Sequence, residues 1–219
     1  MKFVWGIVVT LLTATITMAL LFASLSFVLA GVPWLAVIIP GVAMAIYGIV
    51  AAAVGSYDLS SGGGWLALLV DCTWSLPNTL FGAALGLPVY ALFGAPSTSQ
   101  SQGQNWVSYA PRSSTGFGNN VLQTLGTVNL GGAGQHERMH LLQARIFGPL
   151  YLPLFAVFYI ATSLIQILFT LILGLALKAA NLRSSACLRP PADSAVSGFF
   201  GWIYYATPFE VWAYASGNP

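Results

Sequence analysis

Two long stretches without a charged residue constrain this chain more than any other feature. Residues 3–57 and 146–177 contain no Asp, Glu, Lys or Arg. A helix needs about 20 apolar residues to cross the hydrocarbon core of a bilayer. Over all 219 residues only 5% are charged, whereas a soluble domain has about 25%. So few charges cannot coat a water-soluble surface. The sequence therefore predicts a multi-pass integral membrane protein that contacts the lipid bilayer.

The first stretch predicts a helical hairpin over residues 3–54. Gly31 and Pro33 flank a break between two apolar segments, residues 3–30 and 34–54. Glycine and proline in close succession end one helix and begin the next. The apolar run after Lys2 is about twice as long as the core of a signal peptide. We therefore expect the first segment to be a retained helix.

A third apolar segment, residues 65–94, completes an N-terminal region over residues 1–94. Asp71, Pro77 and Pro88 interrupt it, so it is either one kinked crossing or a re-entrant pair. Gly82 and Gly86 form a GxxxG pair, which predicts the close approach of another helix. Asp71 is costly inside a membrane, so it is either functional or placed at the headgroup level or at a helix cap.

The remaining chain divides into a polar part and a second apolar part. Residues 95–134 contain many Ser, Gln, Gly and Asn residues, which predicts an extramembrane loop. Within this loop, residues 121–130 are expected to form an edge strand or an extended connector. Residues 135–219 predict a short helix over residues 135–147 that ends at Gly148 and Pro149, a transmembrane helix at about 150–177 and a C-terminal segment that carries Glu210. The expected fold is thus all-α, with about four transmembrane helices.

A metal-binding motif opens this last region. His136, Glu137 and His140 form an HExxH pattern that contains both histidines of the chain and one of its two glutamates. On a helix the two imidazoles share one face, and the glutamate lies close enough to act on water at the metal. Chance placement of these residues is on the order of one in ten thousand. The alternative is a buried polar seam without metal. Gln143 lies on the histidine face, where it is a candidate to support a ligand.

A catalytic zinc ion usually has three protein ligands, so the motif requires a third. Neither cysteine has a suitable spacing, which indicates a carboxylate. Glu210 is the other glutamate of the chain, and Asp71 and Asp193 are the alternatives. A competing interpretation exists, because Thr207-x-x-Glu210 is also a capping box, in which Glu210 would hydrogen-bond the start of a helix.

These residues resemble a family. HExxH followed at a distance by ExxA is similar to the gluzincins, in particular to membrane-embedded zinc peptidases of the HtpX and Ste24 type. The resemblance implies zinc ligation by His136, His140 and Glu210, with Glu137 as general base. Tyr214 stands where that family has an aspartate that supports a ligand histidine.

The same region also resembles small uncharacterised bacterial membrane proteins with an HExxHxxQ helix, a GPLYLP-like turn and a later PFE motif. Residues 148–153 and 208–210 match that pattern. This similarity implies a location in a bacterial inner membrane.

Two functions follow as expectations. The first is a zinc-dependent membrane metallopeptidase that hydrolyses a peptide or a membrane-protein substrate at the membrane surface. The second is a non-catalytic subunit that binds other membrane proteins and keeps a degenerate or structural metal site. Nucleic acid is excluded as a partner, because the net charge of +2 is small and scattered.

Overall fold

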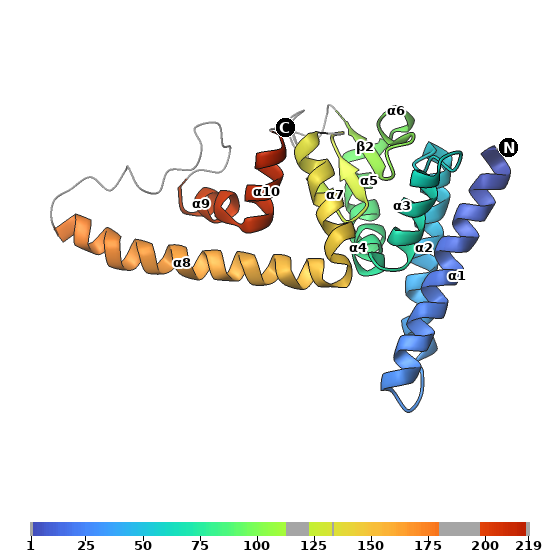
Figure 1. The fold of residues 1–219 in the computed structure, drawn as a ribbon, viewed down its shortest axis with the longest axis horizontal. Helices are drawn as coiled ribbons and strands as arrows, with labels where there is room; N and C mark the ends of the chain where they lie inside the picture. Colours follow the sequence, from blue (N-terminus) through green and yellow to red (C-terminus); the bar gives the residue numbers. More distant parts are fainter. Residues whose placement is uncertain (1, 113–122, 133, 180–197, 218–219) are drawn as a thin grey trace. The chain divides into compact units, whose positions relative to one another are not determined.

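A computed structural model describes residues 2–112, 123–132, 134–179 and 198–217 (Figure 1). The chain divides into two compact units. Unit 1 comprises Met1–Tyr151 with Pro219, and unit 2 comprises Leu152–Asn218. Helices make up most of both units, as the uncharged stretches predict.

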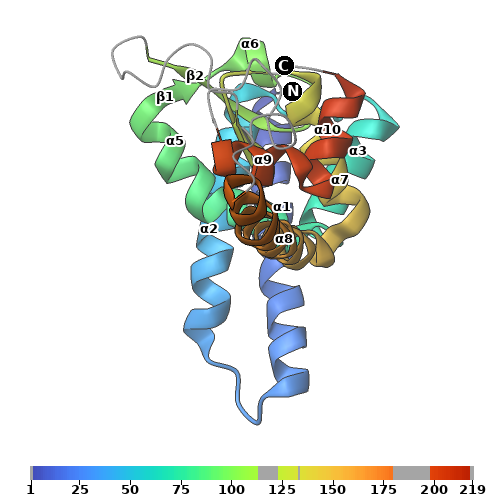
Figure 2. The same cartoon turned by 90° about the vertical axis from the view of Figure 1, so that its left-hand side faces the viewer.

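Unit 1 begins with the predicted hairpin. Helices α1 (Lys2–Val28) and α2 (Trp34–Val54) lie side by side in both views (Figures 1 and 2). Thr13 Oγ1 donates a hydrogen bond to the Met44 carbonyl, at 3.0 Å. A Cβ atom at Gly48 would lie 2.8 Å from the Thr10 Cα, so glycine is needed for this close approach. The hairpin prediction is confirmed, and α2 has the expected bounds.

The third apolar segment forms two helices with a break between them. Helix α3 (Gly62–Cys72) is followed by α4 (Leu76–Phe81), the π-helix η1 (Gly82–Gly86) and α5 (Leu87–Phe93). Pro77 lies in the first turn of α4, where a missing N–H group costs little, and Pro88 directly follows the π-helix η1. The last three elements follow one another directly over residues 76–93, so the kink lies at residues 73–75.

A four-stranded sheet replaces much of the expected polar loop. Strands β1 (Gly94–Pro96), β2 (Val107–Pro111), β3 (Gln123–Leu125) and β4 (Val128–Leu130) have the order β1-β2-β4-β3. The β2–β4 pair is parallel and the other two pairs are antiparallel. The short helix α6 (Thr98–Ser101) connects β1 to β2. The expectation of an all-α fold with at most one strand therefore missed a small sheet.

The Gly82–Gly86 pair allows the close approach of a β-hairpin, whereas the GxxxG pattern predicted the close approach of a helix. A Cβ atom at Gly82 would lie 2.5 Å from the Leu125 carbonyl oxygen, and one at Gly86 would lie 3.0 Å from the Val128 Cβ. The β3–β4 turn approaches just as closely, because a Cβ at Gly126 would clash with the Asn78 carbonyl oxygen. These glycines allow the β3–β4 hairpin to lie on α4 and η1.

The core of unit 1 joins the helices to one face of the sheet. Its fully or almost fully buried side chains come from α2, α3, α5, β2 and β4, and include Met44, Tyr47, Leu68, Tyr90, Val107, Val128 and Leu130. Unit 1 ends with α7 (Gln135–Phe147), which has the bounds that the sequence predicts, and the 3₁₀ turn η2 (Gly148–Leu150).

Unit 2 consists of α8 (Tyr151–Ala179), α9 (Gly198–Ala206) and α10 (Pro208–Ser216). Phe209 on α10 packs against Phe155 and Phe158 on α8, with ring centroids 6.4 and 5.2 Å apart. Helix α8 covers the residues, about 150–177, at which the sequence predicts a transmembrane helix.

Four helical segments in the described residues are long and apolar enough to span a membrane: Val4–Val28, Trp34–Val54, Leu76–Phe93 and Gln135–Leu168. This agrees with the expected number of about four.

Candidate metal centre

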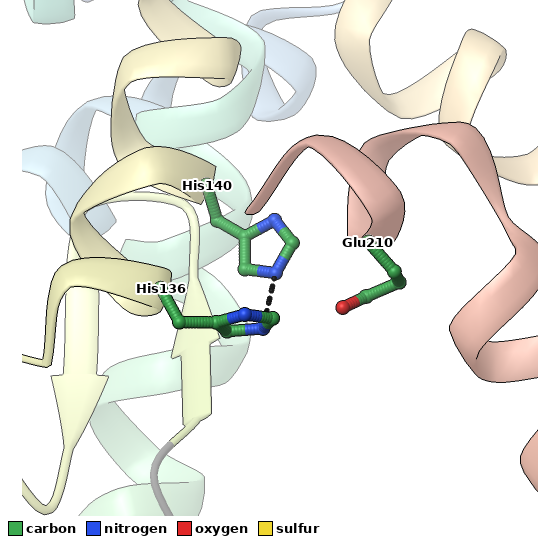
Figure 3. A group of neighbouring side chains, drawn as sticks. All are labelled: His136, His140 and Glu210. Carbon is green, nitrogen blue, oxygen red and sulfur yellow. Dashed lines mark hydrogen bonds between the residues drawn. The ribbon is translucent and has the colours of Figure 1, made fainter. Parts of the chain in front are cut away.

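Helix α7 brings the two histidines of the motif together. His136 and His140 are four residues apart, so they lie one turn apart on one face, and their Nε2 atoms are 3.1 Å apart (Figure 3). Two nitrogen ligands of a tetrahedral zinc ion are about 3.3 Å apart when each Zn–N bond is about 2.05 Å. The two imidazoles are therefore spaced for binding one ion.

Gln143 contacts the second histidine from the next turn of α7. Its Oε1 lies 3.0 Å from His140 Nδ1, and its side chain is fully buried. A carbonyl oxygen only accepts hydrogen bonds, so this contact suits the His140 tautomer that has its proton on Nδ1 and a lone pair on Nε2. Such a contact orients a metal-binding histidine. The role of Gln143 in metal binding stays a prediction.

Glu137 follows His136 directly in the sequence, and its side chain is buried in the structure. Among the described residues, its buried Oε2 atom has no hydrogen-bond partner. A buried carboxylate oxygen without a partner is costly, and such atoms are uncommon in folded proteins. The site therefore contains a proton acceptor that the fold itself does not use.

A buried ion pair fixes α7 to α3. Arg145 donates hydrogen bonds from Nε and one terminal nitrogen to the two carboxylate oxygens of Asp71, at 2.8 and 2.6 Å. The same guanidinium donates to the Asn105 carbonyl at 2.7 Å, and Tyr57 donates its hydroxyl to Asp71 at 2.8 Å. Asp71 is thus held by structural partners. The sequence left open that Asp71 is a third metal ligand or a helix cap. In the structure Asp71 instead pairs with Arg145.

The C-terminal end of α7 is held by side chains from the α3–α4 region. Asn78 donates hydrogen bonds to the carbonyls of Gly148 at 2.7 Å and Ala144 at 3.2 Å, and Ser75 donates to Ala144 at 3.0 Å. The last carbonyls of a helix have no partner within the helix, so these contacts satisfy them. The helix that carries both histidines is therefore anchored along its second half.

Glu210 lies on α10, in unit 2. The Tyr159 hydroxyl of α8 donates to its Oε1 at 3.0 Å, and the Glu210 side chain is buried. Thr207 precedes the helix, but its hydroxyl donates back to the Ile203 carbonyl at 2.7 Å and makes no capping bond. The part of the capping-box interpretation in which the Thr207 hydroxyl caps the helix is therefore wrong. Sequence reasoning missed Tyr159, although a tyrosine inside a long apolar helix signals a need for a polar partner.

His136 and His140 belong to unit 1 and Glu210 belongs to unit 2, so Glu210 as the third ligand stays a prediction. Two imidazoles and one carboxylate would form a donor set that zinc accepts. Asp193, the other alternative ligand, lies outside the described residues.

Tyr214 belongs to an aromatic cluster of unit 2. Its ring centroid lies 5.0 Å from that of Tyr205 and 6.2 Å from that of Tyr204. Burial raises the pKa of the Tyr214 hydroxyl to about 12. A neutral phenol at this position does not supply the carboxylate that the gluzincins have there.

No protein-family profile, curated protein or solved structure matches this chain.

Proposed function

We propose that this protein is a zinc-dependent metallopeptidase of a bacterial inner membrane, which hydrolyses peptide bonds at the membrane surface. The observation that carries the proposal is the pair of Nε2 atoms 3.1 Å apart on α7, with a buried glutamate between the two histidines in the sequence. The four apolar helical segments support membrane insertion.

In this proposal His136, His140 and Glu210 bind the zinc ion. The bound ion would supply a Lewis acid that polarises the scissile carbonyl and makes a water molecule more acidic. Gln143 keeps the His140 proton on Nδ1, so that Nε2 is available as a ligand.

Glu137 acts as the general base. Its unpartnered buried oxygen accepts the proton of the attacking water, and the same carboxyl group then delivers a proton to the departing amine. A buried acceptor without another partner is suited to this transfer, since it is not already engaged in the fold.

The substrate would bind as an added strand. In the sheet order β3 lies at one edge, and it contacts α7. An exposed edge offers unpaired N–H and C=O groups to an extended peptide. A peptide in an extended conformation, including a segment of another membrane protein, is the substrate class that this edge favours.

Metal analysis and a matched set of variants test the proposal. We expect about one zinc per purified chain, loss of zinc in His136→Ala, and retained zinc with loss of metal-dependent peptide cleavage in Glu137→Gln. Arg138→Gln is the control, because Arg138 is the exposed neighbour on α7. Absence of zinc from the wild-type protein, or equal cleavage by Glu137→Gln, would refute the peptidase.

The second candidate function is a non-catalytic subunit of a membrane complex. Tyr214 favours it, because an aromatic cluster occupies the position where a supporting carboxylate is expected. X-ray absorption spectroscopy separates the two functions. Zinc with three protein ligands and one water indicates a catalytic site, whereas zinc with four protein ligands indicates a structural one.

A further inference from the structure

A cavity of about 670 Å³ lies in unit 1, and its lining residues do not include any residue of α7. It lies at the N-terminal end of α1 and the C-terminal end of α2, and residues 57–60, Thr98 and residues 102–103 also line it. Its volume is within the range of small-molecule sites, about 300–1,000 Å³. The proposed peptidase chemistry uses none of its residues.

The walls of the cavity are apolar and come from the two helices. Val9 on α1 and Ala51 and Val54 on α2 are buried wall residues. Gly6 and Ala52 face one another across the helix pair, since a Cβ atom at Gly6 would lie 3.4 Å from the Ala52 Cβ. Such walls favour a hydrocarbon chain over a polar ligand.

The rim is polar and is tied to the helix end by backbone hydrogen bonds. Gly103 N–H donates to the Gly55 carbonyl at 2.9 Å, and Asn105 N–H donates to the Ser56 carbonyl at 2.8 Å. These bonds hold the segment that carries Gln102 against the end of α2. The cavity is therefore largely pre-formed, as ligand sites usually are.

Asp58 is the one charged residue among the lining residues. Ser60 donates its N–H and hydroxyl to the Asp58 Oδ1, and these bonds lower the pKa of the Asp58 carboxyl. The Asp58 side chain is exposed, so its carboxylate is accessible to a ligand. The rim thus presents one anionic acceptor, together with the donor groups of Thr98 and Gln102.

Tryptophan side chains mark the same level of the molecule. Trp5 lines the cavity and contacts Trp65 edge to face, with ring centroids 5.8 Å apart. Tryptophan is enriched where a membrane protein meets the headgroup layer. Helices α1 and α2 are long enough to span a bilayer, and if they do so the mouth of the cavity lies at the depth of lipid headgroups.

We propose that this cavity binds one acyl chain of an aminophospholipid, with the ammonium group of the lipid at Asp58. The apolar walls take the chain, the carboxylate takes the ammonium, and Thr98 and Gln102 donate to the phosphate. A lipid with an anionic, amine-free headgroup is disfavoured, because its charge would face Asp58. This site rests on membrane insertion of α1 and α2 but not on the peptidase activity.

Native mass spectrometry of the full chain tests the site. The probes are lysophosphatidylethanolamine and lysophosphatidylglycerol with the same 16-carbon chain, titrated separately. We expect one ethanolamine lipid per chain and weaker binding of the glycerol lipid. Asp58→Asn should reduce the ethanolamine affinity by about twofold to fivefold, the range of an exposed ion pair. It should leave the glycerol lipid unchanged or better bound.

A filling variant tests the walls. Ala52→Phe should lower the affinity for the ethanolamine lipid more than tenfold, whereas Ala36→Phe, on an exposed part of the same helix, should not. Equal affinity for the two headgroups on the unmodified chain would overturn the proposal without any variant. Unchanged binding to a folded Ala52→Phe protein would also overturn it. Neither result bears on zinc content or cleavage, so failure here is distinct from failure of the peptidase.

Discussion

Replacing Arg145 with methionine tests whether the buried ion pair holds the histidine helix in place. The substitution removes the two hydrogen bonds to Asp71 and the one to the Asn105 carbonyl. Methionine keeps an unbranched apolar stem of similar length, so the lost interaction is mainly that of the charge. Asp71, whose side chain is 0% exposed, then retains Tyr57 as its hydroxyl donor.

Two estimates of the cost agree. Removing one partner of a buried ion pair costs about 3–5 kcal/mol of unfolding free energy. Two unit charges about 4 Å apart attract by about 4 kcal/mol at an effective dielectric constant of about 20. Asp71→Asn should cost less, about 1–3 kcal/mol, because the Arg145 side chain is 18% exposed and reaches water.

The double variant Asp71→Leu/Arg145→Met gives the decisive comparison. Replacing both partners of a buried pair with apolar residues is often nearly neutral. The double variant should therefore be more stable than the sum of the single changes Asp71→Leu and Arg145→Met predicts, by at least about 2 kcal/mol. Unfolding in mixed detergent micelles, followed by circular dichroism, measures each free energy.

Arg138→Met is the control, because Arg138 is on the exposed face of α7. Its unfolding free energy should change by less than about 0.5 kcal/mol. Zinc affinity, measured by chelator competition, should fall in Arg145→Met and not in the control, since the anchored helix carries both histidines. An Arg145→Met protein as stable as the control, or additive single and double changes, would refute the anchoring role.

Three further predictions concern other parts of unit 1. Gln143→Leu should lower zinc affinity by about tenfold to a hundredfold, because His140 loses the acceptor for its Nδ1 proton; chelator competition measures this, and an unchanged affinity would contradict it. Gly126→Ala should be more destabilising than Gly103→Ala in thermal unfolding. Both glycines have positive φ, of 58° and 69°, but only the Cβ at Gly126 would meet a backbone atom, the Asn78 carbonyl oxygen; equal costs would show that the close approach is unimportant. Burial raises the pKa of Tyr57 well above 10, so the folded chain keeps this proton while the unfolded chain loses it near pH 10. The stability contributed by Tyr57 should thus be complete below that pH and decline above it, with a shallower decline in Tyr57→Phe.

The helices that could be predicted best are those bounded by strong local signals. Both α2 and α7 have their expected ends, because Pro33 precedes α2, Gly55 follows it, and Gly134 and Gly148 bracket α7. Glycine and proline act on the backbone within one or two residues, so their effect can be read without knowing the tertiary structure.

The sheet could not be predicted in this way. Its strands are three to five residues long, too short for a pattern of alternating burial to be distinguished from a loop. The parallel pair of strands β2 and β4 joins Val107 to Val128. The β3–β4 hairpin lies against Gly82 and Gly86. Such pairings are non-local, and burial against the helices stabilises them.

Asp71 shows the same limit for a single residue. The cost of a charge among apolar residues indicated that Asp71 needs a partner or a function. The partner, Arg145, is 74 positions away and sits within the last turn of the histidine helix. Cost arguments identify the residue that needs compensation, whereas the fold decides which residue compensates it.

Glu210 extends this reasoning to the candidate metal centre. Its local sequence fits both a capping box and a ligand motif, and both are physically sound. The hydroxyl of Thr207 distinguishes them, because it donates backward to Ile203 and so leaves the helix start without a side-chain cap. The Glu210 carboxylate is buried and accepts a hydrogen bond from Tyr159, so its local contacts do not support helix capping. We therefore prefer the ligand role, which stays a prediction. Zinc content of Glu210→Gln, compared with Thr207→Val as the capping control, would test that preference directly: loss of zinc in the first and retention in the second supports ligation, and equal retention would return Glu210 to a structural role.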